Sequence, residues 1–399
     1  MPARLTDNPA AAHAPEAALL LCCARTSMGP EDARRLTQLT GSSLNWSLLL
    51  RLARPHGLMP LLYWHLRTIC PDSVPPSTLE ELRDHFERNS RRNLLYLAEL
   101  LELLKLFEQN GIAAIPYKGP VLAATVYGNL ALREFIDLDI LVPKSRVREA
   151  RDLLVARGYQ PGSILATDRQ EAAFLDSGHE LVHRHPTKQI GVELQWELLP
   201  RYMTIPIDLE QLRRSLVPIT IGKATVPGFP PEDLLLILCV HGANHCWQRL
   251  DWICGVSEVI RRHREIDWRR MVEQAEALGC RRILFLGLFL AADLLKSAVP
   301  HGLREDIEAD DAVRSLTDEV ERHLFDLSAV PRNPLAAALF HLRTRERLRD
   351  QVTFCFRLAT TLAPADTQWA DLPGKLRLFY FPVRLIRLVR KYGAAGRAF

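Results

Sequence analysis

The chain has 399 residues, of which 48% are hydrophobic and 25% are charged, an ordinary composition for a globular protein. Its 51 basic and 47 acidic residues give a net charge of +4, which is too small to indicate a nucleic-acid-binding protein. The sequence contains neither a run of about 18 apolar residues nor the basic flank and apolar core of a signal peptide. We therefore expect a soluble, cytoplasmic protein without a transmembrane segment.

Eight cysteines occur, but none forms a C-x-x-C pair, and their spacing suits neither a zinc cluster nor a small disulfide framework. In a chain of this length they are expected to be reduced and mostly buried, which again favours the cytoplasm.

The N-terminal part is predicted to be helical. Residues 1–16 are rich in Ala and Pro and are expected to be disordered at the start, and the apolar spacing from about Pro15 to Cys70 is helical. Prolines then interrupt the chain up to Pro76. Ser77 and Glu80 form an S-x-x-E pattern that predicts a capped helix running to Phe107, with Gly111 as the stop.

A small mixed α/β unit is predicted to follow. The apolar run 112–116 and the segment 135–142 are predicted strands, and 179–184 and 190–197 are two more. Lys118-Gly119-Pro120 makes a turn before a short helix over 121–127. Another helix is expected from Lys144 or Ser145 to about Gly158.

After Pro200 the apolar spacing is again helical. A helix is expected to begin at Pro230–Asp233 and to run to His245, and four more are expected at 253–264, 268–278, 281–296 and 311–325.

Two aspartates mark the second predicted strand. Side chains on a strand alternate between faces, so Asp137 and Asp139 point the same way, about 7 Å apart, while Leu138 and Ile140 point into a core. Two such carboxylates repel each other unless a cation lies between them, and Mg²⁺ is often shared between carboxylates and substrate phosphates. A bare D-x-D is usually a solvated strand end, so the neighbouring residues must show whether these aspartates bind a cation.

A later strand supplies further carboxylates. Glu193 would be the third ligand, with Gln195 and Glu197 on the same face and Glu197 a rival for that role. Three carboxylates on two strands fit a two-metal site for phosphoryl or nucleotidyl transfer.

Basic residues precede the aspartates. Gly119 permits close backbone approach, and Lys118 at the start of a helix favours phosphate. Arg133 could neutralise phosphate charge in the same cleft, or it could be a surface arginine paired with Glu134.

These residues resemble the signature of the uncharacterised bacterial nucleotidyltransferases of the DNA polymerase β superfamily. The resemblance rests on Lys118-Gly119, Tyr127-Gly128, Arg133, the run Asp137-Leu138-Asp139-Ile140-Leu141-Val142 and the later strand Val192-Glu193-Leu194-Gln195-Trp196, and it extends to Pro231–Trp252. It spans roughly residues 90 to 265. Gln195 stands where that family commonly has His, and the usual Gly-Ser dipeptide of the superfamily is absent, with Lys118-Gly119 in its place.

The resemblance implies an α+β fold, in which a small nucleotidyltransferase-type mixed sheet is flanked by helices and lies between N-terminal and C-terminal mainly helical regions. We expect a helical region at 1–76, the nucleotidyltransferase core at 77–228, a helical domain at 229–365 and a basic segment at 366–399.

The implied activity is metal-dependent transfer of a nucleotidyl group from a nucleoside triphosphate such as ATP to a hydroxyl or phosphate acceptor that the sequence does not identify. Asp137, Asp139 and Glu193 would be catalytic and hold Mg²⁺ (or Mn²⁺). Lys118, Gly119 and Arg133 would bind the nucleotide. The alternative is a non-catalytic nucleotide-binding or scaffold protein on the same fold, and a nucleic-acid partner is not expected.

Several histidines and tryptophans allow more than one interpretation. His241 and His245 have a spacing that can bind zinc, but packing or lining of the substrate site is favoured because H-E-x-x-H is incomplete. His179, His183 and His185 alternate on a strand, and metal ligation is the lesser alternative. Trp247 and Trp252 are expected in the core, unless one lies near the cleft and stacks on a nucleobase.

The C-terminal segment from Lys375 to Lys391 is basic and amphipathic. Arg384, Arg387 and Lys391 share one helical face, with Leu385, Leu388 and Val389 opposite. Docking of this helix on the body of the protein is favoured, and peripheral binding to an acidic membrane surface is the alternative.

Overall fold

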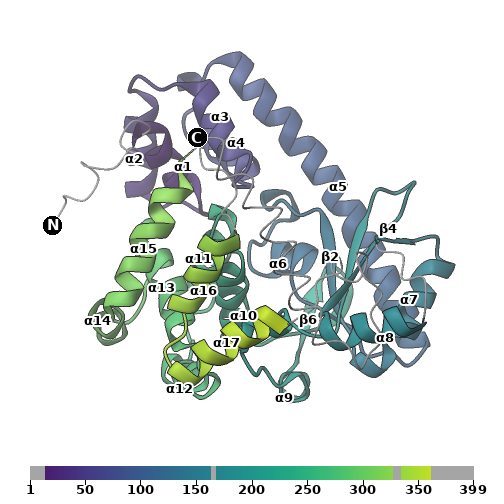
Figure 1. Cartoon of the computed structure of the whole chain (residues 1–399). Coiled ribbons are helices and arrows are strands. Elements are labelled where there is room, and N and C mark those ends of the chain that lie inside the picture. The colour runs from purple at the N-terminus through teal and green to yellow at the C-terminus, as the bar shows by residue number, and fades with distance from the viewer. Residues whose placement is uncertain (1–13, 163–167, 327–333, 361–399) are drawn as a thin grey trace, which may run out of the picture.

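The computed structural model describes residues 14–162, 168–326 and 334–360. Helices dominate, and they surround one five-stranded sheet and one hairpin (Figure 1). The strands are β1 (Ile115–Pro116), β2 (Asp137–Leu141), β3 (Gln160–Pro161), β4 (Glu180–Arg184), β5 (Gly191–Gln195), β6 (Val217–Ile221) and β7 (Ala224–Gly228). The helices are α1 (Ala14–Cys23), α2 (Pro30–Thr40), α3 (Trp46–Ala53), α4 (Met59–Ile69), α5 (Pro76–Gln109), α6 (Gly119–Thr125), α7 (Val147–Ala156), α8 (Asp168–Ser177), α9 (Leu209–Arg214), α10 (Pro231–Asn244), α11 (Leu250–Arg262), α12 (Trp268–Leu278), α13 (Arg281–Leu295), α14 (His301–Ala309), α15 (Asp311–Leu324), α16 (Pro334–Arg343) and α17 (Leu348–Thr360).

The sheet has the strand order β1-β2-β5-β4-β3. β2 and β5 are parallel neighbours, and the other pairs are antiparallel, so the sheet is mixed as predicted. The register sets Asp139 beside Glu193 and Leu138 beside Val192. Because directly paired residues share a face, one face of the central strands is acidic and the other is apolar.

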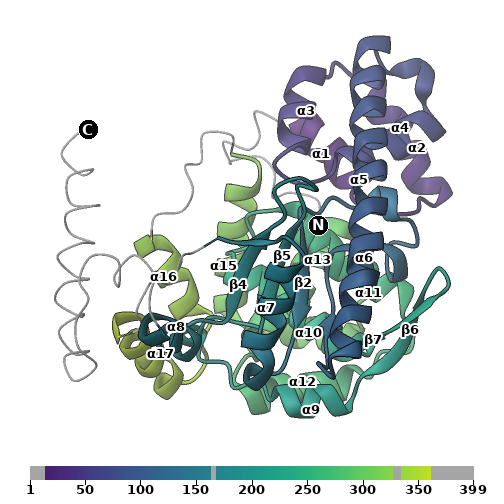
Figure 2. The ribbon, with the colours of Figure 1, turned by 90° about the vertical axis from the view of Figure 1, so that its right-hand side faces the viewer.

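The apolar face makes a core with α5 and α7. Leu138, Ile140, Val192 and Leu194 have no exposed surface and belong to one cluster with residues of both helices. Figure 2 shows α7 in front of the sheet and α5 beside it. The apolar/acidic alternation in the sequence thus decides which face the helices cover.

A second, larger core joins the two ends of the described chain. Helices α1–α4 and α10–α15 contribute to a single hydrophobic cluster. Polar contacts cross the same boundary, since Thr26 Oγ1 donates to Glu258 Oε2 at 2.6 Å and His56 contacts the Leu324 carbonyl oxygen at 2.6 Å. The N-terminal helices therefore pack against the later helical region (Figure 1).

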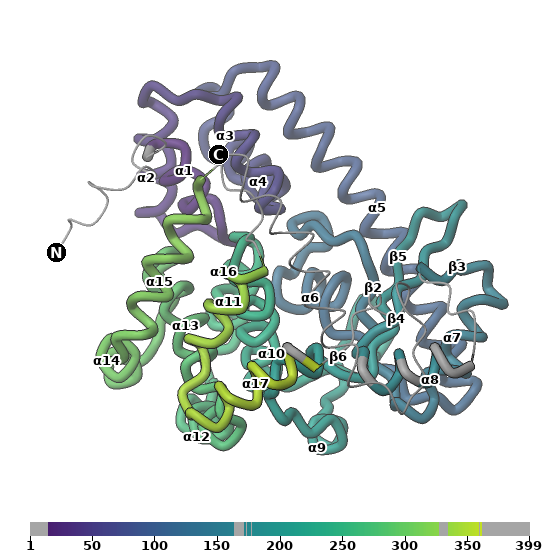
Figure 3. The backbone as a smooth tube through the Cα atoms, viewed as in Figure 1, coloured from purple at the N-terminus to yellow at the C-terminus, as the bar shows by residue number. Residues whose placement is uncertain are grey.

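The helix α5 links the helical body to the α/β unit. Its 34 residues extend about 51 Å at 1.5 Å per residue, from the N-terminal helices to the sheet (Figure 3). It begins earlier than predicted, at Pro76, and its start has no side-chain capping hydrogen bond. The predicted capping box of Ser77 and Glu80 was therefore wrong. Ser77 lies inside the helix, which begins at Pro76, a residue whose fixed φ angle suits the first helical position.

The hairpin of β6 and β7 was not predicted, since the segment after Pro200 was expected to be helical. Its strands are antiparallel, with Ile221 paired to Ala224 across a two-residue turn. The short strand β3 was also missed, and β2 is shorter than the predicted 135–142.

All eight cysteines lie within the described residues and none forms a disulfide; seven are buried and Cys355 is exposed. Within the described ranges, the structure has no helix that is long and apolar enough to cross a membrane. The predictions for the N-terminal 13 residues and for the basic segment from Lys375 to Lys391 fall outside the described residues.

Candidate active site

A cleft of about 560 Å³ lies between the acidic face of the sheet and the helices α10 and α11. This volume is in the range of small-molecule sites. All six residues that the sequence singles out for catalysis and nucleotide binding line it: Lys118, Gly119, Arg133, Asp137, Asp139 and Glu193.

The carboxylates come from three neighbouring strands. Asp137 and Asp139 lie on β2, and Glu193 on β5 is the direct neighbour of Asp139. Glu180 on β4, which the sequence did not indicate, lines the same cleft, whereas Glu197 lines a different cavity beside Arg201 and Arg357. Of the two rivals for the third carboxylate, Glu193 is therefore the one in the cleft.

Crowding alters the ionisation of these groups. Burial and the charges of Asp139 and Glu180 raise the pKa of Glu193 to about 8. Burial and Asp139 raise the pKa of Asp137 to about 6. The cluster thus disfavours its own negative charge, and an added cation would relieve that repulsion.

Lys118 supplies part of the positive charge. Its Nζ atom lies 2.6 Å from Asp139 Oδ1, and both side chains are at least nine-tenths buried. Burial alone would lower the pKa of Lys118, but the Asp139 carboxylate raises it well above its ordinary value, so the ammonium group remains charged.

The glycine after Lys118 is required by the backbone. Gly119 has a φ of +50°, and a Cβ atom there would lie 3.2 Å from the carbonyl oxygen of Asp137. This close approach brings the turn that carries Lys118 against the beginning of β2.

Arg133 is buried with 9% of its surface exposed, and among the described residues none accepts a hydrogen bond from its Nε or Nη1 atom. It is not paired with Glu134, which instead contacts His85 Nε2 at 2.9 Å. A buried guanidinium group with unsatisfied donors is costly, so its place in the cleft suggests an anionic ligand.

Two asparagines of α5 hold the Arg133 segment, and the sequence did not reveal them. Asn89 Nδ2 donates to the carbonyl oxygens of Ala131 and Arg133 at 3.0 and 3.1 Å. Asn93 Nδ2 donates to the same Arg133 oxygen at 2.8 Å. Their four-residue spacing on one face of a helix is a visible signal, but the partner is a loop that the sequence does not identify.

The opposite wall of the cleft is aromatic. The rings of His241, His245 and Trp252 are in mutual contact, with centroids 4.7 to 5.6 Å apart. Arg249 forms a bidentate ion pair with Asp251 at 2.8 and 2.9 Å. Burial and the nearby Lys118 hold the pKa of His241 well below its ordinary value, so this ring is neutral near pH 7.

The three histidines of the predicted strand and Trp247 lie in different parts of the structure. His179 lines the cleft, His183 is fully buried, and His185 packs against Tyr159. Trp247 is buried in the helical core as expected. Among the described residues, no group of three or more His, Cys, Asp or Glu side chains is close enough together to hold a metal ion.

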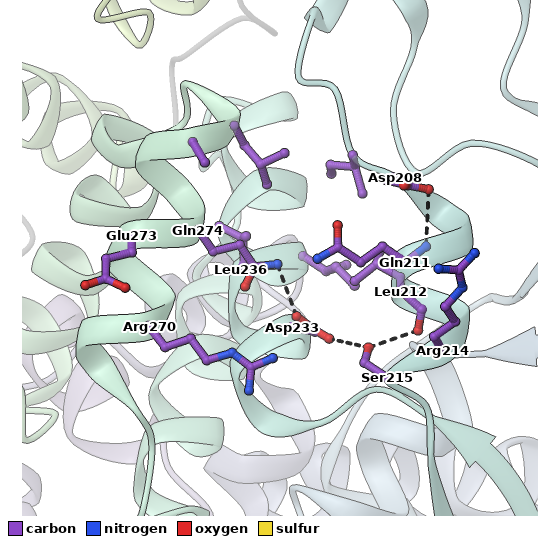
Figure 4. A pocket seen from close by; sticks show the side chains of 14 residues that line it. Asp208, Gln211, Leu212, Arg214, Ser215, Asp233, Leu236, Arg270, Glu273 and Gln274 are labelled. Carbon is purple, nitrogen blue, oxygen red and sulfur yellow. Dashed lines mark hydrogen bonds between the residues drawn. The ribbon is translucent and has the colours of Figure 1, made fainter.

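A second cavity of about 500 Å³ lies between α9, α10 and α12 (Figure 4). Its buried carboxylate, Asp233, accepts hydrogen bonds from Ser215 Oγ at 2.7 Å and Gln274 Nε2 at 3.3 Å. Asp233 is thus satisfied by its neighbours, and none of the six residues singled out in the sequence lines this cavity.

Comparison with known proteins identifies the family. No curated protein matches the chain. The sequence profile of a family described as uncharacterised nucleotidyltransferase matches residues 42–296, more than half of the chain and all of the cleft residues named in the sequence. The chain therefore belongs to this uncharacterised nucleotidyltransferase family.

Proposed function

We propose that this protein transfers a nucleotidyl group from a nucleoside triphosphate to a hydroxyl or phosphate acceptor, with Mg²⁺ or Mn²⁺ as cofactor. The observation that carries the proposal is the pairing of opposite charges in one cleft. Carboxylates of adjacent parallel strands line a cleft with Lys118, which contacts Asp139, and with the buried Arg133, whose Nε and Nη1 donors are unsatisfied among the described residues.

The donor set has the chemistry that a hard divalent cation takes, because Asp137, Asp139 and Glu193 offer carboxylate oxygens from one sheet face, but these side chains would have to move closer together to hold it. Their raised pKa values support this, since carboxylates that repel each other gain from a cation. When bound, the metal ion would neutralise charge on the phosphates and the attacking oxygen. In the structure, Lys118 Nζ contacts Asp139 Oδ1 and partly neutralises this carboxylate, so a metal ion would compete with Lys118 for it.

The basic residues would orient the triphosphate. Lys118 would leave the Asp139 carboxylate and contact a phosphate oxygen instead. Arg133 gains partners for its Nε and Nη1 atoms, which adds charge-assisted hydrogen bonds where there were none. Glu193 would also help to activate the acceptor by accepting the proton of its hydroxyl group.

A matched pair of variants tests this assignment. We expect Glu193→Gln and Asp139→Asn to lower release of pyrophosphate from Mg²⁺–ATP by about a hundredfold or more. Glu197→Gln removes the rival carboxylate of the same strand region, which lines another cavity, and should leave the rate within about twofold. Equal losses in Glu193→Gln and Glu197→Gln would refute the site.

A second candidate function is nucleotide binding without transfer. It is favoured by the ion pair of Lys118 with Asp139, which already balances one carboxylate without a metal ion. Titration calorimetry distinguishes the two: this candidate predicts nucleotide binding that persists without Mg²⁺ and in Asp139→Asn, with no release of pyrophosphate.

A further inference from the structure

The side chain of Gln195 lies at the centre of the carboxylate cluster. It is 4% exposed and stands on β5 in register with Leu141 of β2 and Glu180 of β4. Its Nε2 atom lies 3.1 Å from Glu193 Oε2, 3.2 Å from Asp139 Oδ1 and 3.4 Å from Glu180 Oε2. One amide group thus contacts carboxylates from three strands.

Tyr117 fixes which end of this amide faces the carboxylates. Its hydroxyl group donates to Gln195 Oε1 at 2.5 Å, and Tyr117 is itself 4% exposed. Burial raises the pKa of the Tyr117 phenol well above its ordinary value, so it stays a donor. A phenol can also accept a hydrogen bond, but the carboxylates on the other side of the amide call for a donor, so the NH₂ group of Gln195 faces the acidic side and its Oε1 atom accepts from Tyr117.

The amide does what a charged side chain could not. Its two N–H groups are shared among Asp139, Glu180 and Glu193, with the longest contact to Glu180, and they carry no charge, so the amide orients the carboxylates without taking the place of a cation. A neutral imidazole could do the same in part, because one ring nitrogen accepts and the other donates. A methionine of similar length offers neither a donor nor a strong acceptor.

We propose that Gln195, oriented by Tyr117, is a positioning residue that aligns the carboxylates of β2, β4 and β5 for a divalent cation, with Glu180 as an additional member of that cluster. The inference rests on the proposed function, since it assumes that these carboxylates bind a metal ion. Partners that orient metal ligands typically contribute tenfold to a hundredfold to metal affinity.

The test measures binding of Mn²⁺ alone to the full chain by electron paramagnetic resonance. We expect Gln195→Met and Tyr117→Phe each to weaken binding by about tenfold or more, and Gln195→His to retain most of it. The double variant should bind no more weakly than Gln195→Met, because Tyr117 acts through Gln195.

A control variant separates positioning from general loss of stability. Tyr159→Phe removes another buried phenol hydroxyl, one that donates to Glu99 at 3.2 Å away from the cleft. It should leave Mn²⁺ affinity unchanged even if it lowers the thermal unfolding temperature as much as Tyr117→Phe does.

The outcomes are distinguishable. If wild type binds Mn²⁺ no more tightly than Asp139→Asn does, both the metal site and the positioning role are overturned. If wild type binds Mn²⁺ and Gln195→Met binds it equally well, only the positioning role is overturned. Weaker binding in Gln195→Met with Tyr159→Phe unchanged supports the proposal.

Discussion

The turn at Gly119 allows a quantitative test of how the basic residue is placed. Gly119 and Gly111 both have positive φ angles, +50° and +66°. Replacing either by alanine forces a side chain into the left-handed region, which costs about 1 kcal/mol. The two positions differ in their surroundings: a Cβ at Gly119 would lie 3.2 Å from the Asp137 carbonyl oxygen, whereas none of the described atoms lies within 4 Å of a Cβ at Gly111.

Gly111→Ala should therefore lower the free energy of unfolding by about 1 kcal/mol and leave the cleft unchanged. Gly119→Ala carries the same backbone cost and must also push the turn away from β2 by a few tenths of an ångström. We expect it to cost about 2 kcal/mol in total and to weaken binding of Mg²⁺–ATP by about tenfold, since the turn carries Lys118.

Denaturant unfolding gives the first quantity and titration calorimetry the second. Equal losses of stability and equal nucleotide binding in the two variants would contradict a role for the close approach at Gly119. Weaker binding in Gly111→Ala, to the same extent as in Gly119→Ala, would also contradict that role, because the effect would then come from backbone strain alone.

Three further predictions concern charge. Replacing Arg133 by methionine should weaken nucleotide binding by about tenfold or more in titration calorimetry. The unfolding temperature should not fall, because the unsatisfied donors of Arg133 contribute nothing to the fold. A large loss of stability would contradict the anion-binding role. Glu99→Gln should lower the free energy of unfolding by about 2 kcal/mol in denaturant, since the buried carboxylate accepts hydrogen bonds from Arg157 and Lys188. Glu102→Gln, at an exposed carboxylate, should lower it by almost nothing. Similar losses in the two variants would contradict the role of these hydrogen bonds. The pKa of Glu193 rises from about 4.5 on folding to about 8, so its contribution to stability is present at low pH and is lost as pH increases through that range. Mg²⁺ favours the ionised form, so saturating Mg²⁺ should raise the unfolding temperature more near pH 8 than near pH 5, and an equal shift at both would count against a metal site.

The central strands were predictable because their residues alternate. The order Asp137, Leu138, Asp139, Ile140 fixes which side chains share a face, and Glu193 falls beside Asp139 once the strands are parallel neighbours. The three carboxylates therefore meet on one face of the sheet, whereas alternation does not explain why Lys118, Gly119 and Arg133 line the same cleft. Their chemical roles stay predictions.

Features that depend on pairing between distant segments were not predictable. Glu180 reaches the cleft only because β4 pairs with β5 in a register that sets it beside Gln195. Gln195 itself was noted only as a departure from the family pattern, because the hydrogen bond from Tyr117 crosses 78 positions. Nothing in the sequence shows that Arg133 is buried.

The missed hairpin has a local reason. Pro218 and Pro227 interrupt the alternation of β6 and β7 and argue against strands in the interior of a sheet. In a two-stranded ribbon both strands are edge strands. A proline, which has no backbone N–H group, can therefore occupy a position whose nitrogen faces away from the partner strand. The Gly222-Lys223 turn was the available signal.

The shared helical core has a consequence for synthesis on the ribosome. Helices α1–α4 bury their apolar faces against α10–α15, and those partners emerge roughly 170 to 300 residues later. At about 5–20 residues per second, that delay is on the order of tens of seconds. The core of the α/β unit, whose residues lie between Tyr96 and Val226, is complete before the first of these partner helices has emerged. We therefore expect a nascent chain with a complete α/β core and exposed N-terminal helices, which is the stage at which a chaperone would bind.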